Sequence, residues 1–445
     1  MNNQKNTSTS IENLILTPVI NHSLILFKIM IGVLISFLAI RNIYFDFIHT
    51  AYINNTFYWP IWPQMAQHIP RSMFTYLNLG TLLFGIQIAR QKWGAWSYFG
   101  YLICYLPLFT FNYTYYEDYQ LLLITICVLL SLTSHQKAIK SAQIQSWEIL
   151  IFKLLFSSIL LWRVIAYLNI AWLSGTTLKT VLAPTVLKNL LFSPSNWIII
   201  AISISLPIFE CCLALIPWKF PKLIPGLWIG LLLYFYTNIF FDSEFQYSQM
   251  PLLLFALSTL FLPADYPKNF IKKITQLLDK IIQAGKSIST PSQNSTQQIS
   301  PTVKTLIAVY VIIQLIIPLN VYTILPNHKW VITYPTFSWS MKKQRTVQYG
   351  YLTLVNPTTK ETSQIKPPDG VLDTPLTLLI YAHQLRDSYK SQYGVTPEIY
   401  AHLRKSINNR PITPYTNPEI DLSKVNYQFG KSPSWILPQP ENYFK

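Results

Sequence analysis

Four residues that could carry charge or exchange a proton lie inside long apolar stretches. Lys153, Arg163 and Tyr167 share one stretch, and Glu210 lies in another. A charge in a hydrocarbon layer is costly unless it is paired or hydrated, so such residues are candidates for function. At about 1.5 Å of rise per residue, Lys153 and Glu210 lie at similar depths from the inner ends of their stretches, roughly 10 Å for Glu210. This count predicts an ion pair of Glu210 with Lys153 rather than with Arg163, either structural or lining a path. Alternatively, Lys153 extends its ammonium toward the membrane surface.

Polar and aromatic residues gather at the other ends of these apolar stretches, which are predicted to face the outside of the cell. They are Tyr115, Tyr116, Glu117, Asp118, Tyr119, Arg163, Tyr167, Asn169, Asp242, Glu244 and Gln246. They could line one outward-facing cavity, or they could form an interfacial aromatic belt with ordinary loop acids. Arg163 and Tyr167 are four residues apart on one helix face, so the cation would favour tyrosinate if the two touch. Tyr167 is therefore a candidate base.

Several other chemistries find no support in the sequence. None of the seven histidines lies inside an apolar stretch, so we expect neither a metal site nor haem in the membrane. No glycine-rich phosphate loop is present, which argues against a bound nucleotide. The net charge of +16 comes from cations that lie mostly between apolar runs, where they direct topology. We therefore expect no nucleic-acid partner.

The composition indicates which elements must position these residues. Of 445 residues, 51% are hydrophobic and only 12% are charged, which is typical of a polytopic α-helical membrane protein with the lipid bilayer as its partner. Nine stretches are long enough to be predicted as spans: 24–41, 73–89, 94–112, 119–134, 148–167, 196–217, 223–241, 248–263 and 304–325.

The distribution of lysine and arginine predicts the orientation of these spans. Cations concentrate in alternate connections, at residues 90–92, 137–140, 219–222 and 268–286. Positively charged loops stay in the cytoplasm, so the N-terminus is predicted to be cytoplasmic and the C-terminus extracytoplasmic. No cleaved signal peptide is predicted from the polar first twenty residues. The abundance of Ile, Asn and Lys suggests an AT-rich genome, so a bacterial inner (plasma) membrane is the predicted location.

The pattern changes after the ninth stretch. Residues 349–355 and 399–407 alternate between apolar and polar, which is typical of strands. Thr374 and Pro375 provide an N-cap and a first-turn proline for a helix between them. We therefore predict a small extracytoplasmic α+β, mainly β, domain. The predicted parts are a cytoplasmic segment 1–20, an eight-helix bundle 21–263, a surface helix and linker 264–303, a ninth span 304–325 and the outer domain 326–445.

Several segments resemble one known family in the same order along the chain. They are residues 18–19, 23–32, 52–63, 115–123, 166–175, 337–341, 407–411, 418–422 and 435–438. Residues 166–175, which include Asn169, Trp172, Leu173 and Gly175, are similar to the family's Ala-Lys-Leu-Asn/Asp-x-Asp-Trp-Leu-x-Gly stretch. The family is the vitamin K-dependent gamma-glutamyl carboxylases, with their horizontally transferred transmembrane (HTTM) domain.

This resemblance implies an enzyme that oxygenates reduced vitamin K, or another quinone, as its cofactor. The strong base so formed would remove a γ proton from glutamate in an exported peptide, and carbon dioxide would then be added. Residue by residue, the family's catalytic lysine falls on Tyr167, its neighbouring acid on Ala171 and a glycine on Arg163. The family's histidine ahead of the fourth span falls on Glu117. The chain is thus identified as a divergent member that lacks the catalytic lysine.

Three functions follow from this pattern. The first is a divergent carboxylase with Tyr167 as base, Arg163 assisting and Glu117 orienting it, and with a pocket of Tyr116, Asp118, Asn169, Trp172, Asp242 and Glu244. The second is a non-catalytic module, a pseudoenzyme, that binds a quinone, a lipid or an exported peptide. The third is a solute transporter whose path is lined by Lys153 and Glu210.

Overall fold

The structure of the chain is a computed structural model. It describes residues 18–20, 22–49, 71–111, 118–133, 143–168, 170–178, 196–228, 230–231, 249–262, 346–367, 374–407, 410–426 and 433–441, together with residues 372 and 443 and single residues and short pieces between 305 and 330. The predicted surface helix and linker at 264–303 lie outside the described residues. So do Tyr116, Glu117, Asn169, Asp242 and Glu244.

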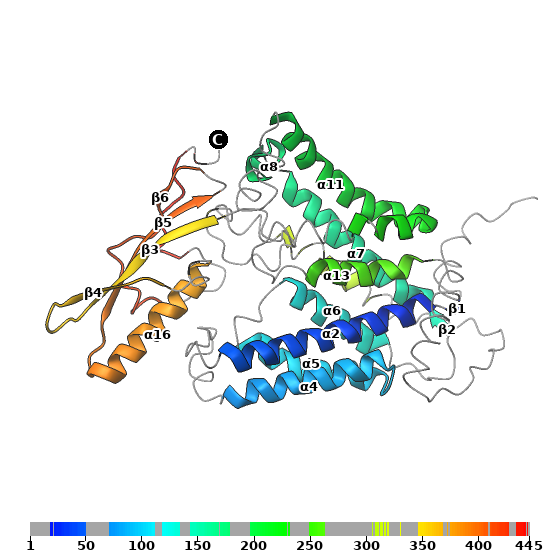
Figure 1. Cartoon of the computed structure of the whole chain (residues 1–445), viewed down its shortest axis with the longest axis horizontal. Coiled ribbons are helices and arrows are strands. Elements are labelled where there is room, and N and C mark those ends of the chain that lie inside the picture. The colour runs from blue at the N-terminus through cyan, green and yellow to red at the C-terminus, as the bar shows by residue number, and fades with distance from the viewer. Residues whose placement is uncertain are drawn as a thin grey trace, which may run out of the picture.

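Apolar helices form a bundle from the first part of the chain (Figure 1). In chain order they are α2 (His22–His49), α4 (Arg71–Ala89), α5 (Ala95–Phe111), α6 (Asp118–Thr133), α7 (Ser146–Tyr167), α8 (Ile170–Leu173), α11 (Asn196–Lys219) and α13 (Gln249–Ser258). Among the described residues, α2, α4, α7 and α11 are long and apolar enough to cross a membrane. A polytopic helical protein is confirmed to this extent, and nine spans stay a prediction.

Helices α2 and α4 pack closely because small residues face the partner helix. A Cβ atom added to Gly32 would lie 2.3 Å from the backbone nitrogen of Ala89, and one added to Gly85 would lie 2.7 Å from Ser36 Oγ. Both distances are far inside van der Waals contact. Small residues that let two backbones approach are a usual means of helix association in membranes, so these two glycines fix the spacing of α2 and α4.

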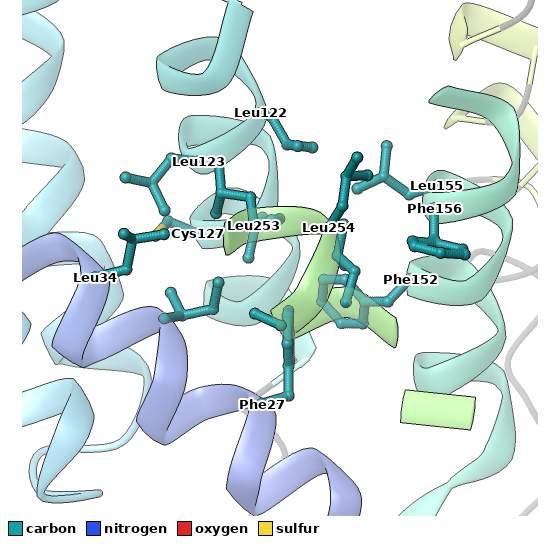
Figure 2. Close-up of a cluster of buried hydrophobic side chains, with 14 of the residues drawn as sticks. Phe27, Leu34, Leu122, Leu123, Cys127, Phe152, Leu155, Phe156, Leu253 and Leu254 are labelled. Carbon is teal, nitrogen blue, oxygen red and sulfur yellow. The ribbon is translucent and has the colours of Figure 1, made fainter. Parts of the chain in front are cut away.

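The centre of the bundle is a cluster of fully buried apolar side chains. Figure 2 shows side chains of α2, α6 and α7 pointing toward Leu253 and Leu254 of α13. The ring centroids of Phe27 and Phe152 are 5.2 Å apart, which joins α2 to α7. The short helix α13, followed by the 3-10 turn η4 (Thr259–Phe261), is therefore a central packing element.

A short antiparallel ribbon ties the beginning of α2 to the beginning of α7. Strand β1 (Pro18–Ile20) pairs with β2 (Gln143–Gln145), with Val19 opposite Ile144. Both strands must lie on one side of the membrane to pair, so the chain crosses an even number of times between them. The predicted spans place four crossings there, which agrees with this parity.

The outer domain contains a four-stranded antiparallel sheet with one helix against it (Figure 1). The strand order is β4 (Thr362–Ile365), β3 (Thr346–Val355), β5 (Glu398–Ile407) and β6 (Thr413–Pro414), and α16 (Pro375–Tyr393) supplies the helix. The strands and helix that the sequence predicts here are confirmed. Thr374 caps α16 as expected, because its hydroxyl accepts a hydrogen bond from the Thr377 amide at 3.1 Å.

The core between this sheet and α16 holds a lysine among aromatic side chains. Lys405 of β5 is fully buried, donates a hydrogen bond to the Trp330 carbonyl at 2.5 Å, and has its ammonium 4.4 Å from the Tyr415 ring centroid. Burial lowers the pKa of Lys405 to about 7. The Lys405 amine is thus held in the core of the domain by one carbonyl and two aromatic rings.

Candidate functional site

Arg163, Tyr167 and Glu210 meet where the end of α7 faces the middle of α11. Arg163 Nη2 lies 2.7 Å from Glu210 Oε1 and Nε lies 2.9 Å from Oε2, so the guanidinium grips both carboxylate oxygens. The Tyr167 hydroxyl donates to Glu210 Oε1 at 2.9 Å. All three side chains are at least 95% buried, with exposures of 4%, 2% and 1%. We call this group the α7–α11 clasp.

The clasp corrects the predicted partner of Glu210. The sequence count pairs Glu210 with Lys153, but Glu210 pairs with Arg163 instead. The pairing with Lys153 would require the first residue of α7 to lie level with the last residue of α11. Ser157 Oγ donates to the Ala214 carbonyl at 2.8 Å, and this contact places α7 and α11 with a stagger. That stagger brings Glu210 opposite Arg163, nearer the C-terminal end of α7 than predicted.

Lys153 lies elsewhere in the bundle. Its ammonium is 5.0 Å from the ring centroid of Phe261, in the turn that follows α13. The partly buried lysine therefore has an aromatic neighbour in place of the predicted carboxylate. A shared path lined by Lys153 and Glu210 loses its structural basis.

Helix α8, which follows α7, packs against the clasp. The ring centroids of Tyr167 and Trp172 are 4.6 Å apart, and Trp172 Nε1 donates to the Ser203 carbonyl of α11 at 2.9 Å. Gly175 ends this turn at φ 76°, and a Cβ there would lie 2.9 Å from Ile199 Cγ2. A residue with a side chain would be both strained and crowded at this position. Trp172 and Gly175 thus hold α8 against α11.

The chemistry of the clasp follows from its hydrogen bonds. Glu210 neutralises the Arg163 charge that the sequence expected to act on Tyr167. The Tyr167 oxygen already gives its hydrogen to a carboxylate, and removing that proton would place a second negative charge beside Glu210. The arrangement therefore favours a phenol that donates a hydrogen bond over a phenolate that accepts a proton.

The structure describes only part of the predicted site. It brings together Arg163, Tyr167 and Trp172, and it adds Glu210, which the sequence assigned to a different pair. Asp118 is described only as the first residue of α6. The predicted roles of Tyr116, Glu117, Asn169, Asp242 and Glu244 fall outside the described residues, so a shared cavity with Tyr167 stays a prediction.

A cavity that sequence reasoning missed lies in the outer domain. It measures about 500 Å³ and is lined by Arg386 and Lys390 of α16, by Glu398 of β5, and by Asp421 and Lys424, among others. We call it the charged groove. Its residues come from four separate segments, and no local sequence motif joins them.

The groove is built around Asp421. Its Oδ1 atom accepts hydrogen bonds from the Ile399 amide at 2.9 Å and the Ser423 amide at 3.0 Å, and its Oδ2 atom lies 3.0 Å from Lys424 Nζ. Burial would raise the pKa of Asp421, but these hydrogen bonds outweigh it and hold the pKa below the ordinary value. Asp421 is thus a fixed anion that ties the loop after β6 to the first residues of β5.

Comparison with known proteins supports one family. Residues 299–442 match the family model described as "Vitamin K-dependent gamma-carboxylase, lumenal domain". The resemblance to the carboxylase family is confirmed over this part of the chain, and the divergence inferred at Tyr167 is not contradicted. Neither the curated proteins nor the solved structures contain a match to the chain.

Proposed function

We propose that this chain is a carboxylase-like membrane protein that does not run the family's proton-abstraction cycle and acts by binding an exported peptide at its outer domain. The observation that carries the proposal is the hydrogen bond from Tyr167 to Glu210. The resemblance places the base of the family at Tyr167, and that position holds a proton donor. The clasp then serves as a structural link between α7 and α11.

The clasp does not fit the role of proton acceptor for a hydroquinone. A base must have a free lone pair and a reason to take a proton. Arg163 and Glu210 neutralise each other, and a second negative charge on Tyr167 would be unfavourable beside the carboxylate. Reduced vitamin K, or another quinone, would therefore be at most a bound ligand of this protein.

A peptide is the ligand that the outer domain supports best. The family match covers this domain, and the charged groove offers both signs of charge along an open surface. Arg386 pairs with Asp387 and Lys424 with Asp421, at 2.8 and 3.0 Å. Lys390 adds a further cation on the α16 side of the groove. These charges support binding of a polar peptide that carries glutamate. We propose that this binding takes place on the extracytoplasmic side of a bacterial plasma membrane, the location that the sequence predicts.

A carboxylation assay tests the first half of the proposal. Membranes with the chain would receive reduced vitamin K, labelled carbon dioxide and a glutamate-rich peptide. We expect no label in the peptide with the wild type. Label that disappears in Tyr167→Phe would overturn the proposal and make Tyr167 a catalytic residue. Label that appears only in Tyr167→Lys would support it, because the rest of a former active site would then be intact.

A binding assay tests the second half. The same glutamate-rich peptide would be titrated onto the purified full chain. Charge reversal by Lys390→Glu or Lys424→Glu should weaken binding by about tenfold if each cation contributes roughly 1.4 kcal/mol. Lys366→Glu, an exposed lysine at the end of β4, is the matched control and should leave binding unchanged. Equal binding by all three variants would exclude the groove as the peptide site.

A further inference from the structure

We propose that the bundle binds the headgroup of an anionic phospholipid where α7 begins and α11 ends. The site consists of Lys153 on α7, Trp218 and Lys219 at the end of α11, and Lys222 in the following turn η2 (Pro221–Leu223). We call it the lysine site. It lies at the opposite end of α7 from the clasp, and it does not depend on whether the chain is an enzyme.

One aromatic ring joins the two helices of the lysine site. The Lys153 ammonium lies 5.0 Å from the Phe261 ring centroid, and the ring centroid of Trp218 lies 5.5 Å from the same ring. Trp218 is fixed further because its Nε1 donates to Ser157 Oγ at 2.7 Å. Lys153 and Trp218 therefore flank a common ring, and Lys219 follows Trp218 directly in the chain.

The three lysines bring positive charge that the described residues do not neutralise. None of them forms an ion pair with another described side chain. Lys153 lies within the membrane-spanning part of α7, where a cation needs a counter-charge or contact with water. A long lysine side chain can extend its ammonium toward the membrane surface. A phosphate group at that surface would supply the missing counter-charge.

The surface beside the lysines favours a lipid as the source of that phosphate. Leu215, Trp218 and Leu223 are exposed by 53%, 41% and 53%. These apolar side chains adjoin the cations. A lipid with an anionic headgroup and apolar acyl chains therefore matches both the lysines and the apolar surface. Basic pockets between membrane helices are known to bind anionic headgroups, and tryptophan is typical of the depth at which such headgroups lie.

The proposal can be tested on the purified full chain by native mass spectrometry with phosphatidylglycerol. We expect wild type to retain phosphatidylglycerol in preference to phosphatidylcholine. Lys219→Met and Lys222→Met, both at exposed positions, should each weaken binding about fivefold, the factor expected for one cation at an anionic surface. Lys153→Met should do the same or more. The matched control is Lys92→Met, an exposed cation in the turn between α4 and α5, which should bind like wild type.

Two results would overturn the lysine site. One is phosphatidylglycerol retention in Lys219→Met and Lys222→Met that equals wild type, since neither substitution touches the core. The other is thermal stabilisation by inorganic phosphate equal to that by phosphatidylglycerol, because the exposed apolar surface would then play no part. Loss of affinity in the three lysine variants alone, with no effect of free phosphate, would support the proposal.

Discussion

The Tyr167 hydroxyl and the Glu210 carboxylate are joined by a hydrogen bond of 2.9 Å between α7 and α11. The direction of this bond decides the chemistry of the position, because the phenol gives its hydrogen and the carboxylate receives it. Arg163 forms an ion pair with the same carboxylate, with Nη2 at 2.7 Å from Oε1. A site that the family resemblance associates with proton removal is here a neutral, fully hydrogen-bonded contact.

Breaking the ion pair on one side should destabilise the bundle more than removing both charges. Arg163→Met leaves the Glu210 carboxylate buried without its cation, and we expect a loss of about 3 to 5 kcal/mol. The double variant Arg163→Met with Glu210→Leu removes both charges and should cost clearly less. Unfolding of the detergent-solubilised protein by sodium dodecyl sulfate measures both. A double variant as unstable as the single one would contradict a clasp held by this pair.

Removing the Tyr167 hydroxyl should have a smaller, structural effect. Tyr167→Phe deletes the hydrogen bond to Glu210, and a hydrogen bond to a charged group is worth about 1.5 to 3 kcal/mol. Tyr76→Phe on α4 is the matched control, since Tyr76 is 70% exposed and should be nearly neutral on substitution. The same unfolding assay applies. If the two variants lose equal stability, the Tyr167 hydrogen bond contributes nothing.

Enlarging Gly85 should push α2 and α4 apart. Gly85→Ala places a methyl group 2.7 Å from Ser36 Oγ and 2.8 Å from Ile35 Cγ2, and overpacking of this kind costs about 1 to 3 kcal/mol. Gly226→Ala is the control, because nothing lies within 4 Å of an added Cβ there. Thermal unfolding in detergent should separate the two variants. The close α2–α4 packing would be in doubt if both behaved alike.

The stability of the outer domain should rise with pH because of Lys405. Its pKa in the folded protein is about 7, well below the ordinary value of 10.5. Between these pH values the unfolded chain binds more protons than the folded one, so raising the pH favours folding, by at most about 1.4 kcal/mol per pH unit. Below about pH 7 the penalty is complete and no longer changes.

Tryptophan fluorescence of the full chain during thermal unfolding at pH 7, 8 and 9 measures this effect, since Trp330 and Trp435 lie in the same core. Lys405→Met should raise the stability at pH 7 and flatten the pH dependence. Lys366→Met, at an exposed position, should keep the wild-type slope. An unchanged slope in Lys405→Met would show that another group causes it.

Local patterns in the sequence predict much of the fold. The apolar runs predict α4, α7 and α11 to within a few residues, whereas α2 extends to His49, well beyond the predicted end at residue 41. Thr374 with Pro375 marks the start of α16. These features depend on periodicity and capping, which are local properties. The partner of Glu210 depends on how far α7 and α11 slide past each other, and that stagger is set by side-chain packing along the whole interface. Counting residues from the helix ends therefore identified Glu210 and Arg163 as intramembrane charges but assigned Glu210 to Lys153 instead of Arg163.

The charged groove illustrates the same limit. Arg386, Glu398 and Lys424 come from three segments whose approach depends on the pairing of β3 with β5 and on the hydrogen bonds of Asp421. None of these residues stands out in the sequence. Tyr167 and Trp172, by contrast, lie five residues apart in the segment 166–175 that resembles the family, so the sequence places both at one predicted site.

The ribbon of β1 and β2 also constrains how the protein is made. Val19 leaves the ribosome long before Ile144, at a synthesis rate of roughly 5 to 20 residues per second. The first strand must wait on its side of the bilayer until the four predicted spans between the two strands have been inserted. Closure of the ribbon would then act as a checkpoint in biogenesis, because a helix inserted upside down would leave the two strands on opposite sides and unable to meet.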